Sequence, residues 1–291
     1  MHSIRVIRPS NANVYRRLNR LADPPRQLFL KGEYDPAQPA VAIIGSRKHS
    51  SYGRLAAESL TGDLASHGVT IISGLALGID SLAHRAALSR QGRTVAVMPG
   101  GLDRVYPASH RQLADQLVNG GGGLISEYPP GTLPAKHHFV ARNRIVAALS
   151  DAVVVVEAAS RSGTLITAEY ALDIGLPVLA VPGPITSPTS IGTNRLIDTG
   201  AKLIASAGDI LLELGLEGRK PAGTYLAASP LGQDIIDRLK FGPMSASQLA
   251  LEVKAKLNQL NRELTHLELD SAIVNLGNNT WSLRSDLRAG S

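Results

Sequence analysis

The chain has 291 residues, 44% of them hydrophobic, and a formal net charge of +6, which leaves room for about two packed domains. It contains no cysteine, which excludes disulfides, thiolate catalysis, iron–sulfur clusters and thiolate zinc sites. No apolar stretch approaches the roughly 20 residues that cross a bilayer, and the first residues lack the apolar core of a secretory signal. We therefore expect a cytoplasmic protein with no membrane partner.

The first 40 residues are predicted to be a short N-terminal extension with a helix near 11–22. Residues 1–40 carry seven Lys and Arg against three Asp and Glu. A modest excess of positive charge suits an anionic ligand, but it is common in proteins that bind none. The charge therefore favours nucleic acid only slightly.

Residues 41–217 predict a doubly wound α/β domain. Short β-branched, apolar runs alternate with segments rich in alanine and leucine that suit helices. The predicted strands are 41–45, 69–73, 94–98, 123–126, 152–157, 177–181 and 202–205. Uniformly apolar strands separated by helices indicate a mostly parallel, Rossmann-like sheet, whose ligands bind beyond the carboxyl ends of the strands.

The last part of the chain predicts a small second domain. Residues 218–224 read GRKPAGT, a composition typical of a linker. Three short helices and a β-hairpin are then predicted within residues 225–287, in the order of a winged helix.

Small and basic residues follow the first two predicted strands. Gly45 permits a tight turn, Ser46 and the next backbone N–H groups can face an anion, and the Arg47 guanidinium suits phosphate. A strand-to-helix turn with a solvated arginine explains these residues equally well. After the second strand, Gly74 leaves room for a ligand backbone, although close packing of helix on sheet is the simpler interpretation.

Asp80 and His84 lie one helical turn apart, which invites a metal site. No third ligand stands nearby, so we expect Asp80 to cap its helix and His84 to pack in the core. The sequence also has no P-loop, no GxGxxG after a strand, no HExxH and no GxSxG. We expect no metal, no cofactor and no catalytic residues.

A phosphate cradle is predicted after the fifth strand, at Arg161, Ser162, Gly163 and Thr164. Backbone N–H groups at a helix N-terminus, the helix dipole and an adjacent guanidinium all favour an anion. A helix cap by Ser162 or Thr164 explains the residues without a ligand. We favour the cradle because small and basic residues coincide at the predicted switch of the sheet.

The segment AKHHFVARNR places many polar side chains ahead of an apolar helix. They are Lys136, His137, His138, Phe139, Arg142, Asn143 and Arg144. Bases of a single strand stack on aromatic rings while cations hold its backbone. A first helical turn that exposes its polar face, with Phe139 in the core, explains the same pattern. Residues two apart on a helix do not share a face, so we expect at least one of Arg142 and Arg144 to be structural.

Taken in order, these stretches resemble the DNA-processing protein A family, also called DprA or Smf. The blocks are DPPRQLFLKG, VAIIGSR, SGLALGIDSLAHRAAL, GGLDRVYP, SEYPPGTLP, FVARNRIVAALS, VVEAASRSGTLITA and GTNRLIDTGA. The resemblance implies a non-enzymatic homodimer of natural transformation. Such a protein binds incoming single-stranded DNA, loads the RecA recombinase onto it and shares or displaces single-strand-binding protein.

The resemblance also implies roles for particular residues. Arg47, the Lys136–Phe139 stretch, residues 142–144 and the Ser162–Thr164 loop would form the strand-binding pocket, with a base stacked on Phe139. One departure from the family pattern is that only about 40 residues precede the first predicted strand. That is too few for the extra N-terminal helical domain that many members carry.

Two alternatives compete with this interpretation. The sheet and its Gly-Thr loop are also similar to LOG-type nucleotide phosphoribohydrolases, whose PGGxGTxxE loop needs its glutamate to cleave the glycosidic bond. Here Thr167 takes that place, and Glu169 lies about 200° round the helix at its ~3.6-residue period. Binding of a free nucleotide, or its hydrolysis, therefore stays open as the alternative.

The other alternative is a duplex-binding regulator that reads DNA with the winged helix. Its third helix carries a single arginine beside acidic residues, and residues 225–291 have no net charge. A duplex reader needs a basic stripe to meet phosphates. We expect this domain to serve protein contacts or regulation instead.

Overall fold

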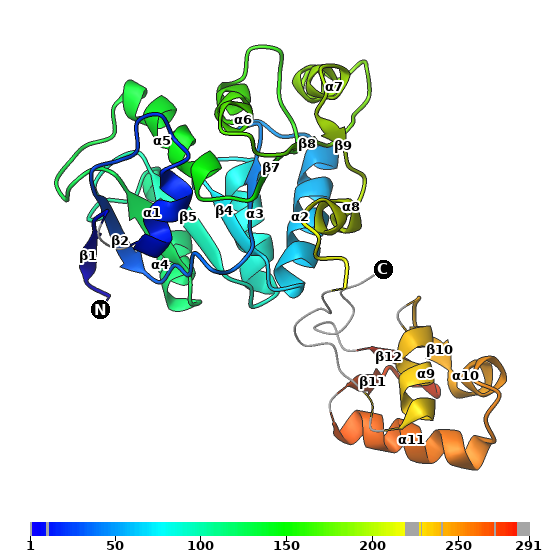
Figure 1. Ribbon diagram of the computed structural model, residues 1–291. Helices are drawn as coiled ribbons and strands as arrows, with labels where there is room; N and C mark the ends of the chain where they lie inside the picture. The colour runs from blue at the N-terminus through cyan, green and yellow to red at the C-terminus, as the bar shows by residue number, and fades with distance from the viewer. Residues whose placement is uncertain are drawn as a thin grey trace. The chain divides into compact units, whose positions relative to one another are not determined.

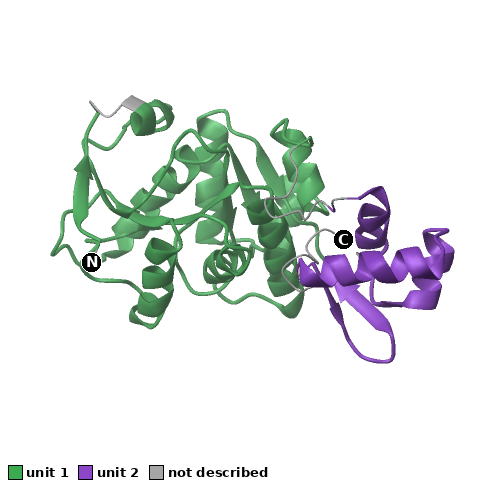
Figure 2. Cartoon of the chain, turned by 90° about the horizontal axis from the view of Figure 1, so that it is seen from below, with its two compact units in different colours: residues 1–219 green, residues 220–291 purple. Residues whose placement is uncertain are grey.

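The computed structural model describes residues 2–9, 12–218, 227, 229–239, 241–270 and 272–283. The chain forms two compact units, Met1–Arg219 and Lys220–Ser291 (Figure 2). Most of the predicted linker, residues 218–224, lies outside the described residues.

A nine-stranded sheet forms the centre of the first unit (Figure 1). Its strands are β1 (Ile4–Ile7), β2 (Leu28–Gly32), β3 (Ala40–Ile44), β4 (Thr70–Ser73), β5 (Thr94–Met98), β6 (Gly123–Ser126), β7 (Ala152–Val155), β8 (Val178–Ala180) and β9 (Lys202–Leu203). They lie in the order β1-β2-β6-β5-β4-β3-β7-β8-β9. Strands β3 to β9 are parallel, so the predicted Rossmann-like sheet and its strands are confirmed.

The segment before residue 40 differs from the predicted extension because it completes this sheet. β2 pairs antiparallel with β6, with Phe29 opposite Ser126, and β1 pairs antiparallel with β2. Between them, α1 is shorter than predicted and spans Ala12–Leu18. The two strands escape sequence analysis because they are defined by pairing with a distant partner, which a local pattern does not reveal.

Helices cover both faces of the sheet, because alternate strand residues point to opposite sides. α2 (Ser51–Ser66), α3 (Ile79–Ser89), α4 (Arg111–Asn119, after the short 3-10 turn Ala108–His110) and α8 (Ala207–Glu213) pack on one face. α1, α5 (Lys136–Ala148), α6 (Gly163–Asp173) and α7 (Ile191–Asp198) pack on the other. The apolar strand residues are therefore buried on both sides.

The chain changes direction across the sheet between β3 and β7. Strands β3 to β6 follow one another outward with their helices on one face, and α5 then crosses to the other face and leads into β7. The loops after β3 and β7 consequently diverge to opposite faces at adjacent strands. In doubly wound sheets this switch is where ligands bind.

The second unit has the three helices and hairpin predicted for a winged helix. It consists of α9 (Pro230–Leu239), β10 (Met244–Ser245), α10 (Ala246–Glu252), α11 (Leu257–Leu269), β11 (Ile273–Asn275) and β12 (Thr280–Leu283). β12 lies between β10 and β11 in a small sheet. α11 buries Leu260, Leu264 and Leu267 against a core that contains Trp281.

His84 is fully buried beneath the sheet, as predicted. Its Nδ1 lies 2.7 Å from Thr94 Oγ1, and that hydroxyl donates to the carbonyl of Ile71 at 2.9 Å. Since the threonine proton is already used, Nδ1 carries the imidazole proton and donates. Burial lowers the pKa of His84 to about 3.

We expect His84 to make folding sensitive to acid. The unfolded chain takes up the proton near pH 6.5 and the folded chain only near pH 3, so stability is complete above about pH 6.5 and falls as the pH drops toward 3. Relative to His84→Gln, the wild type should lose up to about 1.4 kcal/mol per pH unit in that window. Urea unfolding at a series of pH values measures this, with the exposed His137→Gln as control. Parallel curves for wild type and His84→Gln would contradict it.

Candidate functional site

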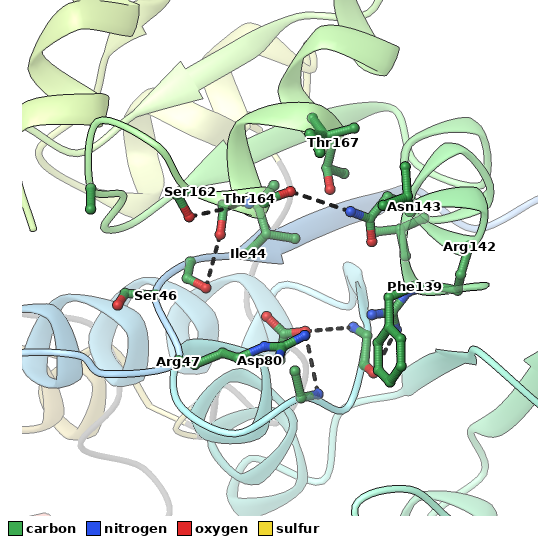
Figure 3. A pocket seen from close by; sticks show the side chains of 18 of the residues that line it. Ile44, Ser46, Arg47, Asp80, Phe139, Arg142, Asn143, Ser162, Thr164 and Thr167 are labelled. Atoms are coloured by element: carbon green, nitrogen blue, oxygen red, sulfur yellow. Dashed lines mark hydrogen bonds between the residues drawn. The ribbon is translucent and has the colours of Figure 1, made fainter. Parts of the chain in front are cut away.

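A pocket of about 660 Å³ opens at the switch of the sheet (Figure 3). It is bounded by the loops after β3, β4 and β7 and by one side of α5. Most of the predicted site residues line it: Gly45, Ser46, Arg47, Gly74, Phe139, Arg142, Asn143, Arg161, Ser162, Gly163 and Thr164. Segments far apart in the sequence thus meet at the switch of the sheet, which is where doubly wound folds bind their ligands.

The N-terminus of α6 forms one wall of the pocket. Ser162 caps the helix by accepting the N–H of Thr164 at 3.2 Å, so the cap that was the alternative to the predicted cradle is present at Ser162. The Thr164 hydroxyl donates to the Gly45 carbonyl at 3.1 Å, and Asn143 Nδ2 donates to the Gly163 carbonyl at 3.3 Å. These bonds hold α6, the β3 loop and α5 together. A Cβ on Gly163 would meet nothing within 4 Å, so the side of the helix end at Gly163 is open.

Arg47 and Phe139 face each other across the mouth of the pocket (Figure 3). Arg47 is exposed, and its Cζ lies 5.5 Å from the centre of the Phe139 ring. Phe139 is only partly buried, and its ring meets that of Tyr106 edge-on at 5.5 Å. Phe139 is therefore not a core residue, and part of its ring is accessible to a planar ligand.

Arg142 lies at the floor of the pocket and is 5% exposed. Its Nη1 donates to the Gly74 carbonyl at 2.5 Å and to the Val97 carbonyl, which joins α5 to the ends of β4 and β5. Burial lowers its pKa to about 10, against the opposing charge of Asp80. A Cβ at Gly74 would overlap the guanidinium, so glycine is required there by this packing rather than by a ligand.

Asp80 does not cap α3, which corrects the sequence prediction. The N-cap of α3 is Gly78, and the Asp80 carboxylate instead accepts the N–H groups of Gly74 at 3.1 Å and Ala76 at 3.4 Å. Burial raises the pKa of Asp80, while Arg142 acts against that shift. Because Gly78 has a φ of +85° and the loop turns back sharply, the carboxylate reaches the loop N–H groups rather than the helix N-terminus.

Four of the predicted residues do not line the pocket. Arg144 forms an ion pair with Glu127, in which Nη2 donates to both carboxylate oxygens at 2.7 and 2.8 Å, and its Nη1 donates to the Asp23 carbonyl at 2.9 Å. The His138 ring stacks on Tyr128 with centres 4.0 Å apart. The other two are Lys136 and His137, which lie exposed on the first turn of α5. Both Arg142 and Arg144 therefore have structural partners.

The comparison with known proteins rests on the same unit. The family model for DNA recombination-mediator protein A matches residues 5–215. The chain belongs to this family, the DprA family. It is 44% identical to protein Smf of Escherichia coli over 216 residues, which is 73% of this chain but 58% of that protein. Little more than half of that relative is therefore represented in the match.

Two solved DprA structures have the same fold. DNA processing protein A from Streptococcus pneumoniae aligns with a TM-score of 0.68 at 42% identity, covering 72% of this chain and 74% of that one. The Helicobacter pylori protein, studied for its single-stranded DNA binding mode, aligns with a TM-score of 0.66 at 31% identity, covering 73% and 96%.

Sequence analysis missed several residues of the DprA pocket. Lys48 is exposed beside Arg47, and its place next to a predicted anion loop could have indicated it. Thr167, which the sequence singled out only as the position of the LOG-type glutamate, lines the pocket from α6, and Thr189 lines it from the loop after β8. Thr189 also donates at 2.9 Å to the buried carboxylate of Glu157. That contact joins distant segments, so no local signal marks it.

Neither a metal cluster nor a membrane helix is found in the described part of the chain. No group of three or more His, Cys, Asp or Glu side chains is arranged to hold an ion among those residues. Their helices are also too short or too polar to cross a membrane.

We expect Arg142→Met to destabilise the protein much more than Arg144→Met. The first change leaves two buried carbonyl groups without their donor and removes from Asp80 the larger of its two opposing charges, the other being Arg47, a loss of about 2–4 kcal/mol. The second breaks a partly exposed ion pair and should lower the free energy of unfolding by about 1–2 kcal/mol. Denaturant unfolding of both variants measures the difference, and an equal or reversed order would contradict this account of the site.

Proposed function

We propose that this pocket binds single-stranded DNA and that the chain is a recombination mediator. The observation that carries the proposal is the pair of Arg47 and Phe139 at the mouth. A guanidinium and an accessible ring together can stack a base and hold its phosphate, and each stacked base contributes about 1–3 kcal/mol. Membership of the DprA family supports the same ligand.

The cations at the rim support an anionic ligand. Arg47, Lys48 and Arg161 are exposed, and among the described residues none of the three forms an ion pair. They lie beside the N-terminus of α6, where the helix dipole favours negative charge. The Ser162 side chain and the Thr164 hydroxyl already have hydrogen-bond partners. A phosphate would therefore be bound by the three cations beside the open side of the helix end at Gly163.

A single strand fits this pocket better than a duplex. The Phe139 ring can stack only on a base that is unpaired and turned out of a helix. The helix α11 of the winged-helix unit exposes Arg262 and Glu268, a mixture of charges rather than the basic stripe that a duplex reader needs. We infer that this unit serves protein contacts or regulation.

Hydrolysis of a nucleotide is the competing function, and the pocket argues against it. Thr167, which stands where a LOG-type enzyme has its glutamate, is buried and lines the pocket, whereas Glu169 is exposed and is not among the lining residues. Without a carboxylate at that position the pocket would bind but not cleave. Release of free base from a nucleoside monophosphate by the purified protein would contradict this.

The remaining parts of the proposal rest on the family resemblance. We infer that the chain acts as a cytoplasmic homodimer in natural transformation, loads RecA onto incoming DNA and meets single-strand-binding protein there. The pocket is compatible with this role, because a mediator must hold a strand without consuming it.

Arg47→Ala should weaken binding of single-stranded DNA about tenfold and reduce its dependence on salt, since one lost phosphate contact lowers the slope of log K against log salt by about 0.7. Phe139→Ala should weaken binding with little change in the salt slope, because it removes stacking rather than charge. Fluorescence anisotropy with labelled oligonucleotides at several salt concentrations measures both.

Arg85→Ala is the matched control for that experiment, because it removes the same charge from an exposed position on α3 that does not line the pocket. A preference for duplex DNA, or unchanged binding by both Arg47→Ala and Phe139→Ala, would refute the proposal.

The mediator role predicts a gain in RecA activity. The wild-type chain should shorten the lag of RecA assembly on DNA coated with single-strand-binding protein, and Arg47→Ala should shorten it less. The DNA-dependent ATPase of RecA reports assembly, and sedimentation should give twice the chain mass of 30.7 kDa. No effect of the wild-type chain on the lag would exclude loading as its function.

A further inference from the structure

A second groove, of about 880 Å³, lies alongside α4. Its walls come from α4, from β2 and from the loop that follows β5. Its lining includes Lys31, Asp103, Arg104, Val105, Ala108, Arg111 and Asp115. None of them lines the first pocket, so the groove is a separate feature of the same unit.

Tyr106 lies between lining residues of the groove and Phe139 of the first pocket, although it is not among the lining residues of either. Its ring meets Phe139, which lines that pocket, at 5.5 Å and an interplanar angle of 73°. Its neighbours Val105 and Ala108 line the groove. Tyr106 is 49% exposed, and among the described residues its hydroxyl has no hydrogen-bond partner. The ring therefore packs against Phe139 while about half of the side chain stays accessible to a ligand.

The cations of the groove are not used by the fold. Within the described ranges, Lys31, Arg104 and Arg111 form no ion pair, in contrast to Arg144 with Glu127. Arg111 is also the first residue of α4, a helix of nine residues, where the dipole adds to its charge. These three side chains are therefore available to an anionic ligand.

Two carboxylates also line the groove and reduce its net positive charge. Asp103 accepts the N–H of Gly131 at 2.8 Å and is held by the loop. Asp115 lies one turn after Arg111 on α4 and has no ion-pair partner among the described residues. Asp115 should therefore repel an anion. Replacing it by a neutral residue should strengthen binding, whereas loss of a cation should weaken it.

We propose that single-stranded DNA leaving the first pocket stacks a base on Tyr106 and continues along the groove, where Arg104 and Arg111 hold its phosphates. This extends the proposed function and rests on it. An aromatic platform followed by unpaired cations is the arrangement that single strands use, with sites of about 4–16 nucleotides. The groove would make binding depend on strand length.

The test compares a short oligothymidylate of about 5 nucleotides with one of about 20, because only the longer one can occupy pocket and groove together. For the full chain carrying both Arg104→Ala and Arg111→Ala, affinity for the long strand should fall about tenfold and its salt slope by about 1.4, from two lost phosphate contacts. Affinity for the short strand should be unchanged.

Single variants separate the contributions of ring and charge. Tyr106→Ala should lower affinity for the long strand about tenfold, whereas Tyr106→Phe, which keeps the ring, should bind like the wild type. Asp115→Asn should strengthen binding of the long strand, and Arg85→Ala should change neither strand. Thermal unfolding of each variant checks that the fold is intact.

The outcomes separate this inference from the proposed function. If Arg47→Ala weakens both strands but the groove variants bind the long strand like the wild type, the groove proposal alone is overturned. An equal loss for short and long strands in the groove variants would also overturn it, because the effect would then act through the first pocket. If Arg47→Ala and Phe139→Ala both leave the binding of either strand unchanged, the proposed function itself fails.

Discussion

The burial of Arg142 is the interaction on which the site depends. A guanidinium taken out of water must find partners, and it finds them in the carbonyl groups of Gly74 and Val97. Those carbonyls belong to the ends of β4 and β5, so the arginine fixes α5 against the carboxyl edge of the sheet. Phe139 stands one turn earlier on α5, and Asn143 follows directly and reaches α6. The pocket keeps its shape because the bonds of Arg142 Nη1 tie α5 to these strand ends, while the Nε of the same side chain is buried without a hydrogen-bond partner.

The same requirement divides the arginines of the first unit into two groups. Arg17 is buried against the Leu149 carbonyl and Asp151, and Arg144 is held by Glu127 and a backbone carbonyl. Arg47 and Arg161 have no such partners in the described part of the chain and stay exposed at the pocket. The number of arginines therefore overstates how many guanidinium groups can bind an anion, because some of them join segments of the fold.

Much of the fold could be predicted from the sequence because each parallel strand is a continuous apolar run that carries its own signal. The loops at the strand ends could be predicted for the same reason, since topology brings the carboxyl ends of parallel strands to one edge. The structural partners of Arg142 and Arg144 could not be predicted from the sequence. Helical periodicity separates their faces, but their partners Gly74 and Glu127 are defined only by the folded chain.

The antiparallel pair β1–β2 has a consequence for self-association. β2 covers β6, whose backbone N–H and C=O groups would otherwise be free to pair with another chain. The outer strand β1 carries Arg5, which is ion-paired with Glu33 just beyond β2, and charges at an edge discourage further pairing. A chain shortened to begin at residue 40 would keep the parallel sheet but expose β6, and it would be prone to aggregate through that edge.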